Sequence, residues 1–438
     1  MAAPTQYLAR YAEPEAQVVA PRIGPQARFL TIPARDERAD DLRSVWSEAR
    51  VEGLCVCIVI NGSAGDPEPV VRQNAQTLAE LSAGAAPIAP GIFLGACDGV
   101  TRLVVDRATG ERRLPRRQGV GLARRIGLDI GCALARAGKL ATPWLATSDA
   151  DARLPAGYFA AADRVCGAVA LAYPFAHAPS DDPASSRAHA IYELFLRYYV
   201  LALRHAGSPY AFHTIGSTLA VDLDAYEAVR GMPKRQAAED FYLLNKLKKL
   251  GSVVTPEVAP IRLRARASGR VPFGTGRATA AIVASGGYPV YHPAIFDALG
   301  AWLDALADEG AHVEARVASA CARLDPPASG WLREAIQSLD LTGLARTLAN
   351  APPGQAPRRA AEWFDAFQTR KLVHALRDLG FGEVPWWEAL RAPFCGLDLS
   401  PATSTAELFA ACARLAELER EPRPTWPAGV GRRPRAPL

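Results

Sequence analysis

Two pairs of carboxylates in the sequence lie where a structural element is expected to end or begin. Asp149 and Asp151 follow the apolar run of ATPWLATSDADARLP, and Glu239 and Asp240 open the segment EDFYLLNKLKKLG. Acidic residues at such places also form ordinary turns and ordinary first helical turns. Carboxylate oxygens are, however, preferred ligands of Mg²⁺ and Mn²⁺, and a carboxylate can serve as a general base. The surrounding elements must decide between these two readings.

The segments before Asp149 predict an α/β sheet. Apolar strand patterns alternate with helical patterns in the order 54–61, 70–84, 101–107, 119–139 and then the run that ends at the aspartates. Such alternation is typical of a mainly parallel sheet covered by helices. Ligands of these sheets bind beyond the carboxyl ends of the strands, and Asp149 and Asp151 stand at such an end. Their position favours a binding role over a plain turn.

Three segments carry a resemblance to a known family. GLARRIGLDIGCALARAGKLATPWLATSDADARLP places a basic helix before a strand, a D-x-D and a proline, and resembles the central block of inverting family 2 glycosyltransferases. AEDFYLLNKLKKLG resembles that family's E-D motif, which opens a helix that ends at glycine, and IGSTLAVDLDAYEAVRGMP resembles the segment between the two. The resemblance covers about residues 50–270 and implies the GT-A fold, a nucleotide-sugar donor and an acceptor hydroxyl.

The resemblance also implies roles for the four carboxylates. Asp149 and Asp151 would bind a divalent metal, Mn²⁺ or Mg²⁺, together with the donor diphosphate. Asp240 would be the base that deprotonates the acceptor hydroxyl, and Glu239 would orient it or contact the acceptor. Inverting sugar transfer needs such a base opposite the leaving diphosphate and a cation to neutralise that group.

Further site residues follow from the same resemblance. Arg124 and Arg125 would contact the donor phosphates, although a solvated helix face explains them as well. The remaining candidates are Asn61 and Asp106 for the nucleobase, with Asp98 as a competing choice, and Gly216 and Ser217 for the acceptor.

The chain departs from the family after the E-D motif. A frequent Q-x-x-R-W element is absent, and the arginine-rich stretch 262–278 stands in its place, as a flap over the donor phosphates or as a basic surface loop. His213 and His292 are candidates for a third metal ligand, although a lone histidine is more often structural.

The whole chain sets the remaining limits. It has 438 residues, 49% of them hydrophobic, and a net charge of +5, which is too weak a basic field to indicate nucleic-acid binding. Its eight cysteines form no CxxC pair, which favours a reducing compartment, and no apolar run reaches the length of a transmembrane segment. We expect a cytoplasmic protein without a transmembrane segment. The expected parts are an N-terminal arm (1–50), a GT-A domain (51–289), a helical C-terminal region (290–420) and a disordered basic tail (421–438).

The sequence thus predicts a metal-dependent inverting glycosyltransferase. One alternative is a nucleotidyltransferase of related α/β fold, which would carry a glycine-rich basic loop directly after its first strand. Another is a non-catalytic nucleotide-binding scaffold. The sugar, the nucleobase and the acceptor are not indicated by the sequence.

Overall fold

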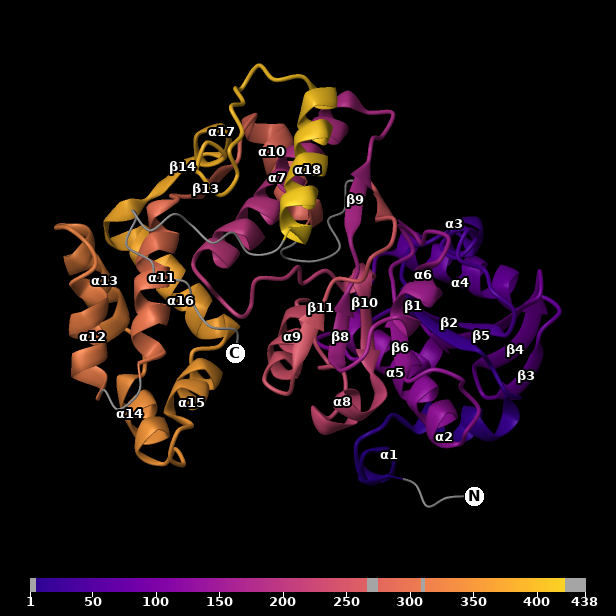
Figure 1. Cartoon of the computed structure of the whole chain (residues 1–438). Helices are drawn as coiled ribbons and strands as arrows, with labels where there is room; N and C mark the ends of the chain where they lie inside the picture. Colours follow the sequence, from indigo (N-terminus) through magenta and orange to yellow (C-terminus); the bar gives the residue numbers. More distant parts are fainter. Residues whose placement is uncertain (1–4, 266–274, 309–311, 422–438) are drawn as a thin grey trace. The chain divides into compact units, whose positions relative to one another are not determined.

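Four parallel strands form the centre of the fold in the computed structural model, which describes residues 5–265, 275–308 and 312–421. Their order across the sheet is β6 (Trp144–Thr147), β1 (Arg28–Ala34), β2 (Leu54–Asn61) and β5 (Val100–Arg107), and each neighbouring pair is parallel (Figure 1). Every residue of β2, LCVCIVIN, is buried, as its continuous run of apolar residues predicts for a strand covered on both faces. Parallel pairing brings the carboxyl ends of all four strands to one edge.

Antiparallel strands extend this block on both sides into a nine-stranded sheet. Beyond β6 lies β10 (Leu219–Asp222), antiparallel to both β6 and β8 (Ala168–Ala172), and then β11 (Ser252–Val254). Beyond β5 lie β4 (Ile92–Cys97) and β3 (Ala86–Ala89). The expected parallel pairing is found in the central block and again between β8 and β11, and the antiparallel pairings of β10, β4 and β3 make the complete sheet mixed.

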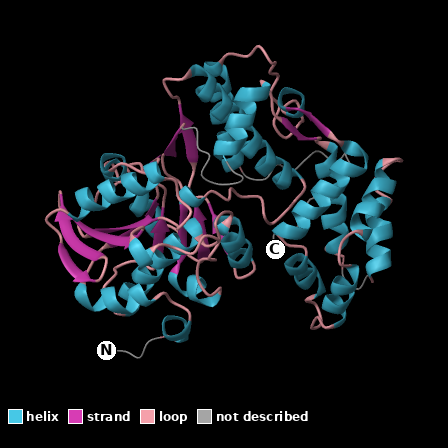
Figure 2. Ribbon diagram, turned by 180° about the vertical axis from the view of Figure 1, so that it is seen from behind, coloured by secondary structure: helices cyan, strands magenta, loops and turns pink. Residues whose placement is uncertain are grey.

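Helices cover both faces of the sheet. The connections from β1 to β2 through α3 (Ala39–Ser44) and from β2 to β5 through α4 (Glu68–Ser82) run in one direction across the sheet. The connection through α5 (Gly119–Arg136) runs back to β6, and right-handed crossovers then place α5 on the opposite face from α4. Figures 1 and 2 show helices on both sides of the strands.

The other elements of this part of the chain are short. The helices are α1 (Gln6–Arg10), α2 (Pro14–Val19), α6 (Tyr158–Asp163), α8 (Leu223–Ala228) and α9 (Glu239–Lys248), with the 3-10 turns η1 (Ala20–Arg22), η2 (Gly110–Arg112) and η3 (Gly216–Thr218). A second, three-stranded sheet has the order β7 (Ala152–Arg153), β12 (Ile261–Arg264), β9 (Phe175–Ala178).

The remaining helices form a separate compact unit, which consists of Asp181–His213 and Ala278–Leu438. Its elements are α7 (Pro183–His205), α10 (Thr275–Ser285), β13 (Pro289–Tyr291), α11 (Ala294–Leu306), α12 (Val313–Cys321), α13 (Ala328–Gln337), α14 (Leu341–Ala349), α15 (Ala356–Trp363), α16 (Ala366–Leu376), η4 (Arg377–Phe381), β14 (Glu383–Pro385), α17 (Trp386–Ala389) and α18 (Thr405–Arg420). α18 packs along α7, and one apolar cluster that includes Trp302 and Trp386 forms the core of this unit.

The boundaries of the two units differ from the expected ones. The sheet unit consists of Met1–Ser180 and Thr214–Arg277. Residues 1–50, expected as an arm, include β1, which pairs with β2 and β6 in the centre of the sheet. Helix α7, expected inside the GT-A domain, belongs to the helical unit. The expected basic tail lies outside the described residues from 422 onward.

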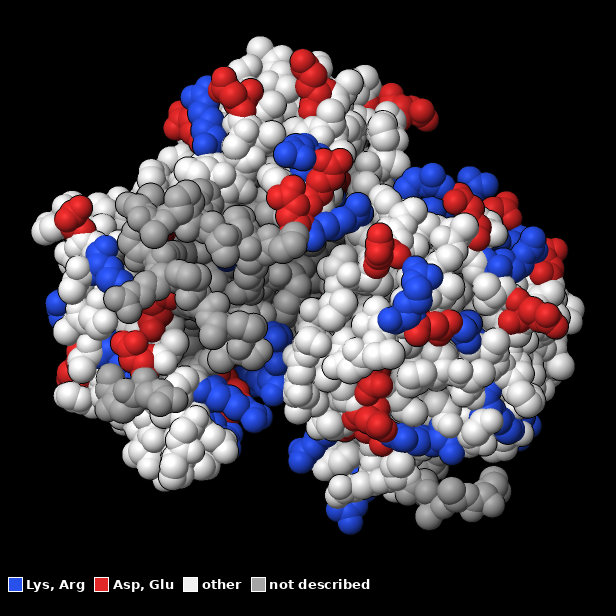
Figure 3. Space-filling model, viewed as in Figure 1, with Lys and Arg blue, Asp and Glu red and all other residues white. Residues whose placement is uncertain are grey.

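Two further features concern the length of the helices and the distribution of charge on the surface. Among the described residues, no helix has both the length and the apolar character needed to cross a membrane. On the face of the sheet unit drawn in Figure 3, basic and acidic side chains are interspersed.

Candidate active site at the carboxyl edge of the sheet

Asp149 and Asp151 lie in the turn that follows β6. The backbone N–H of Ala152 donates to the carbonyl of Asp149 (3.2 Å), and the N–H of Arg264 on β12 donates to the carbonyl of Asp151 (3.0 Å). The Asp149 side chain remains 36% exposed. The turn is thus fixed by its backbone, and the Asp149 side chain is accessible from the carboxyl edge.

The buried guanidinium of Arg124, on α5, connects this turn to the head of α9. Its Nη2 donates to Asp149 Oδ1 (2.5 Å) and its Nε to Glu239 Oε1 (2.9 Å). Its Nη1 donates to the hydroxyl of Thr147 (2.8 Å), the last residue of β6. Burial alone would lower the pKa of Arg124, but the charges of Asp149 and Glu239 raise it. One fixed cation therefore brings together two carboxylates that are 90 residues apart.

Helix α9 begins with an unusual backbone conformation. Ala238, just before the helix, is left-handed (φ 59°), a conformation that residues other than glycine seldom adopt and that often marks functional sites. Glu239 is buried, and Asp240 is partly exposed. Burial, and next the charge of Glu239, raise the pKa of Asp240 to about 7. A carboxylate with such a pKa is suited to accept a proton near neutral pH.

The predicted acceptor residues lie on η3, immediately before β10. A Cβ atom on Gly216 would come within 2.5 Å of Arg124 Nη2, so this position needs glycine for the close approach of the guanidinium. The hydroxyl of Ser148 donates to the carbonyl of Ser217 (2.9 Å). Gly216 and Ser217 therefore belong to the same group of contacts as Arg124.

Asn61 ends β2 at the same edge. Its side chain is buried, and its Oδ1 atom has no hydrogen-bond partner among the described residues. A buried acceptor without a donor is rare in folded proteins and is consistent with a site for a bound polar group.

An ion pair beside Asn61 was missed by the sequence reasoning. Arg35, which follows β1, donates from Nη2 to Asp66 Oδ1 (3.0 Å) in the loop after β2. Burial opposes ionisation of Asp66, but hydrogen bonds from Arg35 and Ser63 lower its pKa overall. Because β1 itself was not predicted, Arg35 could not be placed at the carboxyl edge.

Asp106 and Asp98 lie at opposite ends of β5. Asp106 is buried near the carboxyl end, where its carboxylate accepts from the N–H groups of Ala108 and Thr109 (3.0 Å each) and from Arg112 Nε (2.8 Å). Its oxygens thus organise the loop that follows. Asp98 lies in the turn between β4 and the start of β5, at the amino end of that strand.

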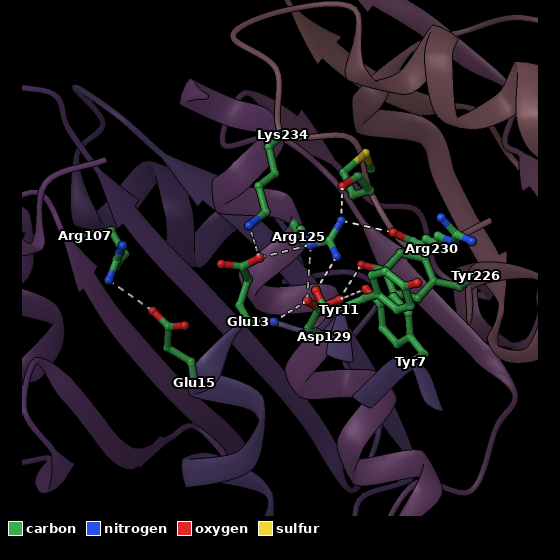
Figure 4. Close-up of polar contacts among 11 residues, drawn as sticks. Tyr7, Tyr11, Glu13, Glu15, Arg107, Arg125, Asp129, Tyr226, Arg230 and Lys234 are labelled. Atoms are coloured by element: carbon green, nitrogen blue, oxygen red, sulfur yellow. Dashed lines mark hydrogen bonds and ion pairs between the residues drawn. The ribbon is translucent and has the colours of Figure 1, made fainter. Parts of the chain in front are cut away.

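Arg125 points away from Arg124. Its Nη1 donates to the carbonyls of Arg230 (3.0 Å) and Met232 (2.9 Å), and its Nη2 to the carbonyl of Tyr11 (2.5 Å). Figure 4 shows the guanidinium among residues of the N-terminal segment and the turn after α8. The structure therefore separates the two arginines, either of which was expected to contact the donor phosphates.

The turn after β6 could hold a divalent cation only with help from a ligand. Oδ1 of Asp149 already accepts a hydrogen bond from Arg124. Within the described ranges, no third His, Cys, Asp or Glu side chain lies close enough to the two aspartates to form a metal-binding group with them. His213 hydrogen-bonds to Glu419 (3.0 Å), and His292 Nδ1 accepts from the N–H of Ala294 (3.1 Å); both belong to the helical unit. Mg²⁺ and Mn²⁺ commonly use one or two carboxylates and complete their coordination with substrate phosphates and water, so the donor set fits such an ion.

Comparisons with known proteins give little further information. No protein-family model matches the sequence, and no curated protein matches it. Among solved structures, the mannosyltransferase PcManGT from Pyrobaculum calidifontis, in complex with GDP-Man and Mn²⁺, matches at 19% identity over 83% of this chain and 89% of that one, with a TM-score of 0.33. A TM-score and an identity this low support no conclusion about activity.

Proposed function

We propose that this protein is a metal-dependent inverting glycosyltransferase of GT-A fold, which transfers a sugar from a nucleotide-sugar donor to an acceptor hydroxyl. The observation that carries the proposal is the double contact of Arg124 with Asp149 and Glu239. This contact joins the D-x-D turn and the E-D helix, the two motifs on which the family resemblance rests, at the edge of the sheet where α/β proteins bind ligands.

In the proposed reaction, Asp149 and Asp151 would hold a divalent metal together with the donor diphosphate. The bound cation supplies the positive charge that stabilises the leaving diphosphate. Asn61 presents its unpartnered Oδ1 to the donor from the end of β2, which β1 separates from β6. Gly216, which packs against Arg124, and Ser217, which accepts from Ser148, would contact the acceptor.

Asp240 is the proposed base. Its raised pKa makes it a stronger proton acceptor than an ordinary aspartate, because burial and Glu239 disfavour its charged form. It removes the proton of the acceptor hydroxyl while the oxygen attacks the anomeric carbon from the side opposite the diphosphate. Glu239, held by Arg124, fixes the first turn of α9 and so the position of Asp240.

The nucleotidyltransferase alternative gains no support. β1 is the first strand among the described residues, and the segment between it and α3, RDER, contains arginines but no glycine. A phosphate-cradling loop of the expected kind is therefore absent after the true first strand as well as after β2.

Thermal unfolding against a panel of nucleoside diphosphates and nucleotide sugars, with and without Mn²⁺, tests the proposal. We expect one nucleobase to raise the unfolding midpoint only when Mn²⁺ is present, followed by sugar transfer with inverted configuration when acceptors are screened by NMR. Absence of any nucleotide-dependent shift would contradict the proposal.

A further inference from the structure

The segment Gln6–Val19 is a small part of the arm expected over residues 1–50, and from here on it alone is called the N-terminal arm. It packs against α5 and against the stretch that leads into α9. That stretch, Arg230–Ala238, is here called the pre-α9 segment. α2 contacts α5, and the hydroxyl of Thr5, just before the arm, donates to Glu227 on α8 (3.0 Å). The arm lies within the sheet unit, far from the D-x-D turn in sequence.

Arg125 joins the arm to the pre-α9 segment. It donates to the backbone carbonyls of Arg230 and Met232 on one side and of Tyr11 on the other. Its Nε lies 3.1 Å from Glu13 Oε1. A guanidinium presents its donors in a rigid fork, so these contacts fix the two backbones relative to α5.

Asp129, one helical turn after Arg125 on α5, binds the arm through hydrogen bonds. Its carboxylate is fully buried and accepts from the hydroxyls of Tyr7 (2.5 Å) and Tyr226 (2.7 Å) and from the N–H of Glu13 (2.8 Å). Burial raises the pKa of Asp129 to about 6, although Arg125 and the tyrosines oppose the rise. The carboxylate is thus satisfied by donors from the arm and from α8 (Figure 4).

Side chains of the arm also contact the pre-α9 segment directly. Glu13 Oε1 lies 2.6 Å from Lys234 Nζ, and the guanidinium of Arg230 stacks 5.0 Å from the centre of the Tyr11 ring. Gly231 is left-handed (φ 74°), and a Cβ atom there would meet the Tyr7 hydroxyl at 2.1 Å. The segment is therefore held at its first, second and fifth residues by the arm.

The last part of the pre-α9 segment is held by α5 and α9. The N–H of Gly121 donates to the carbonyl of Arg235 (2.9 Å), and the Arg235 guanidinium lies 3.6 Å from the centre of the Tyr242 ring. Three residues later the chain takes the left-handed turn at Ala238 and enters α9 at Glu239. The arm, Arg125 and the pre-α9 segment are thus joined by contacts as far as Arg235, from which the backbone leads through Ala238 to Asp240.

We propose that the N-terminal arm is a positioning element of the active site, in which Glu13 and Arg125 set the position of Asp240 through the pre-α9 segment. This inference rests on the proposed role of Asp240 as the base. Glu13, Arg125 and Lys234 are positioning residues, because their contacts reach the reacting groups only through the backbone that leads into α9.

Glu13→Gln is the sharpest test, because it keeps the shape of the side chain and removes only its charge. Lys234→Met is the second variant; Lys234 is 39% exposed, so its loss should not prevent folding. Asp163→Asn is the matched control, since the pair Arg28–Asp163 (2.5 Å) joins β1 to α6 and contacts neither the arm nor α9.

Hydrogen exchange of the unliganded protein gives the first readout. We expect the amides of the pre-α9 segment and the first turn of α9 to exchange about tenfold faster in Glu13→Gln and Lys234→Met, with β2 unchanged. Faster exchange confined to the arm itself would overturn the proposal. This readout holds whether or not the chain transfers sugar, so it is separable from failure of the proposed function.

Kinetics give the second readout. We expect kcat to fall about tenfold in both variants, with the donor KM within about twofold of the wild type, because the base is displaced and donor binding is not. The acid limb of the pH profile should also move in the variants and stay in Asp163→Asn. A loss of unfolding stability with unchanged kcat and unchanged pH profile would overturn the proposal.

Discussion

Arg124 and Arg125 are adjacent on α5, and both are buried, yet they belong to different regions of the molecule. Successive residues of a helix point about 100° apart, so the two guanidinium groups diverge. Arg124 bonds to carboxylate side chains at the carboxyl edge of the sheet, whereas Arg125 bonds mainly to backbone carbonyls of the N-terminal arm and the pre-α9 segment. A basic pair in a sequence is thus not evidence of a single phosphate site, and each arginine has to be tested separately.

The largest effect is expected from substitution of Asp240, because the contacts of Arg124 and those of Arg125 both lead to the start of α9. Asp240→Asn removes the proposed base while retaining the shape of the side chain, and we expect transfer to slow by about 10²–10⁴-fold. The metal-dependent nucleotide shift in thermal unfolding should persist, because Asp149 and Asp151 are untouched. A variant that transfers sugar at the wild-type rate would remove Asp240 from the mechanism.

Replacing each arginine by methionine distinguishes the two regions. Both substitutions leave buried groups without their partner, and we expect each to lower the free energy of unfolding by about 3–5 kcal/mol in urea titrations. Arg124→Met should also abolish the metal-dependent nucleotide shift, because Asp149 and Glu239 lose their common partner. Arg125→Met should retain that shift and slow transfer. The reverse pattern would show that the two regions have been assigned the wrong way round.

Asp151→Ala tests the metal-binding part of the Arg124 region alone. A ligand present at 100 times its dissociation constant adds about 2.7 kcal/mol to the free energy of unfolding, and we expect this gain to disappear in the variant. Unfolding without ligand should change little, since Asp151 is only partly buried. Asp163→Ala, a change of the same type on α6, should retain the gain. An unchanged Mn²⁺-dependent shift in Asp151→Ala would assign the metal elsewhere.

The smallest expected effect is a pH dependence. With the pKa of Asp240 raised to about 7, the base is lost as the pH falls, so kcat/KM should drop about tenfold for each unit below that value. The folded-state pKa lies above the ordinary 3.8, so ionisation of Asp240 makes folding less favourable as the pH rises from about 4 to about 7. Across that pH interval, the free energy of unfolding of Asp240→Asn should increase relative to that of the wild type, as urea titrations at each pH would show. A flat rate profile through pH 7 would contradict the raised pKa.

The sequence predicted the central elements of the sheet unit because their patterns are strong. LCVCIVIN can only be a buried strand, and the helix from Gly119 has both glycines and a clear apolar face. β1 was missed because RFLTIPA contains a proline and lies in a polar, proline-punctuated stretch. In the structure that strand is central, and its proline is accommodated in a parallel pairing with β2.

The sequence indicated the two acidic motifs of the candidate site, and it did not indicate which side chains contact them. Asp149 and Glu239 were each placed at the end of an element, but nothing in the sequence indicates that Arg124 bonds to both. The contact depends on the packing of α5 between two elements distant in the chain and on the missing side chain of Gly216. The role of Glu13 was equally hidden, because only tertiary packing brings the N-terminal arm beside the pre-α9 segment.

We propose that the turn after β6 and the head of α9 form one metal–nucleotide site. Crystals soaked with Mn²⁺ and the nucleoside diphosphate that stabilises the protein would test it most directly, through the anomalous signal of manganese. We expect a single strong peak beside Asp149 and Asp151, with the diphosphate next to it and Asp240 facing the same space. A nucleotide bound elsewhere, or a manganese peak away from these aspartates, would contradict it.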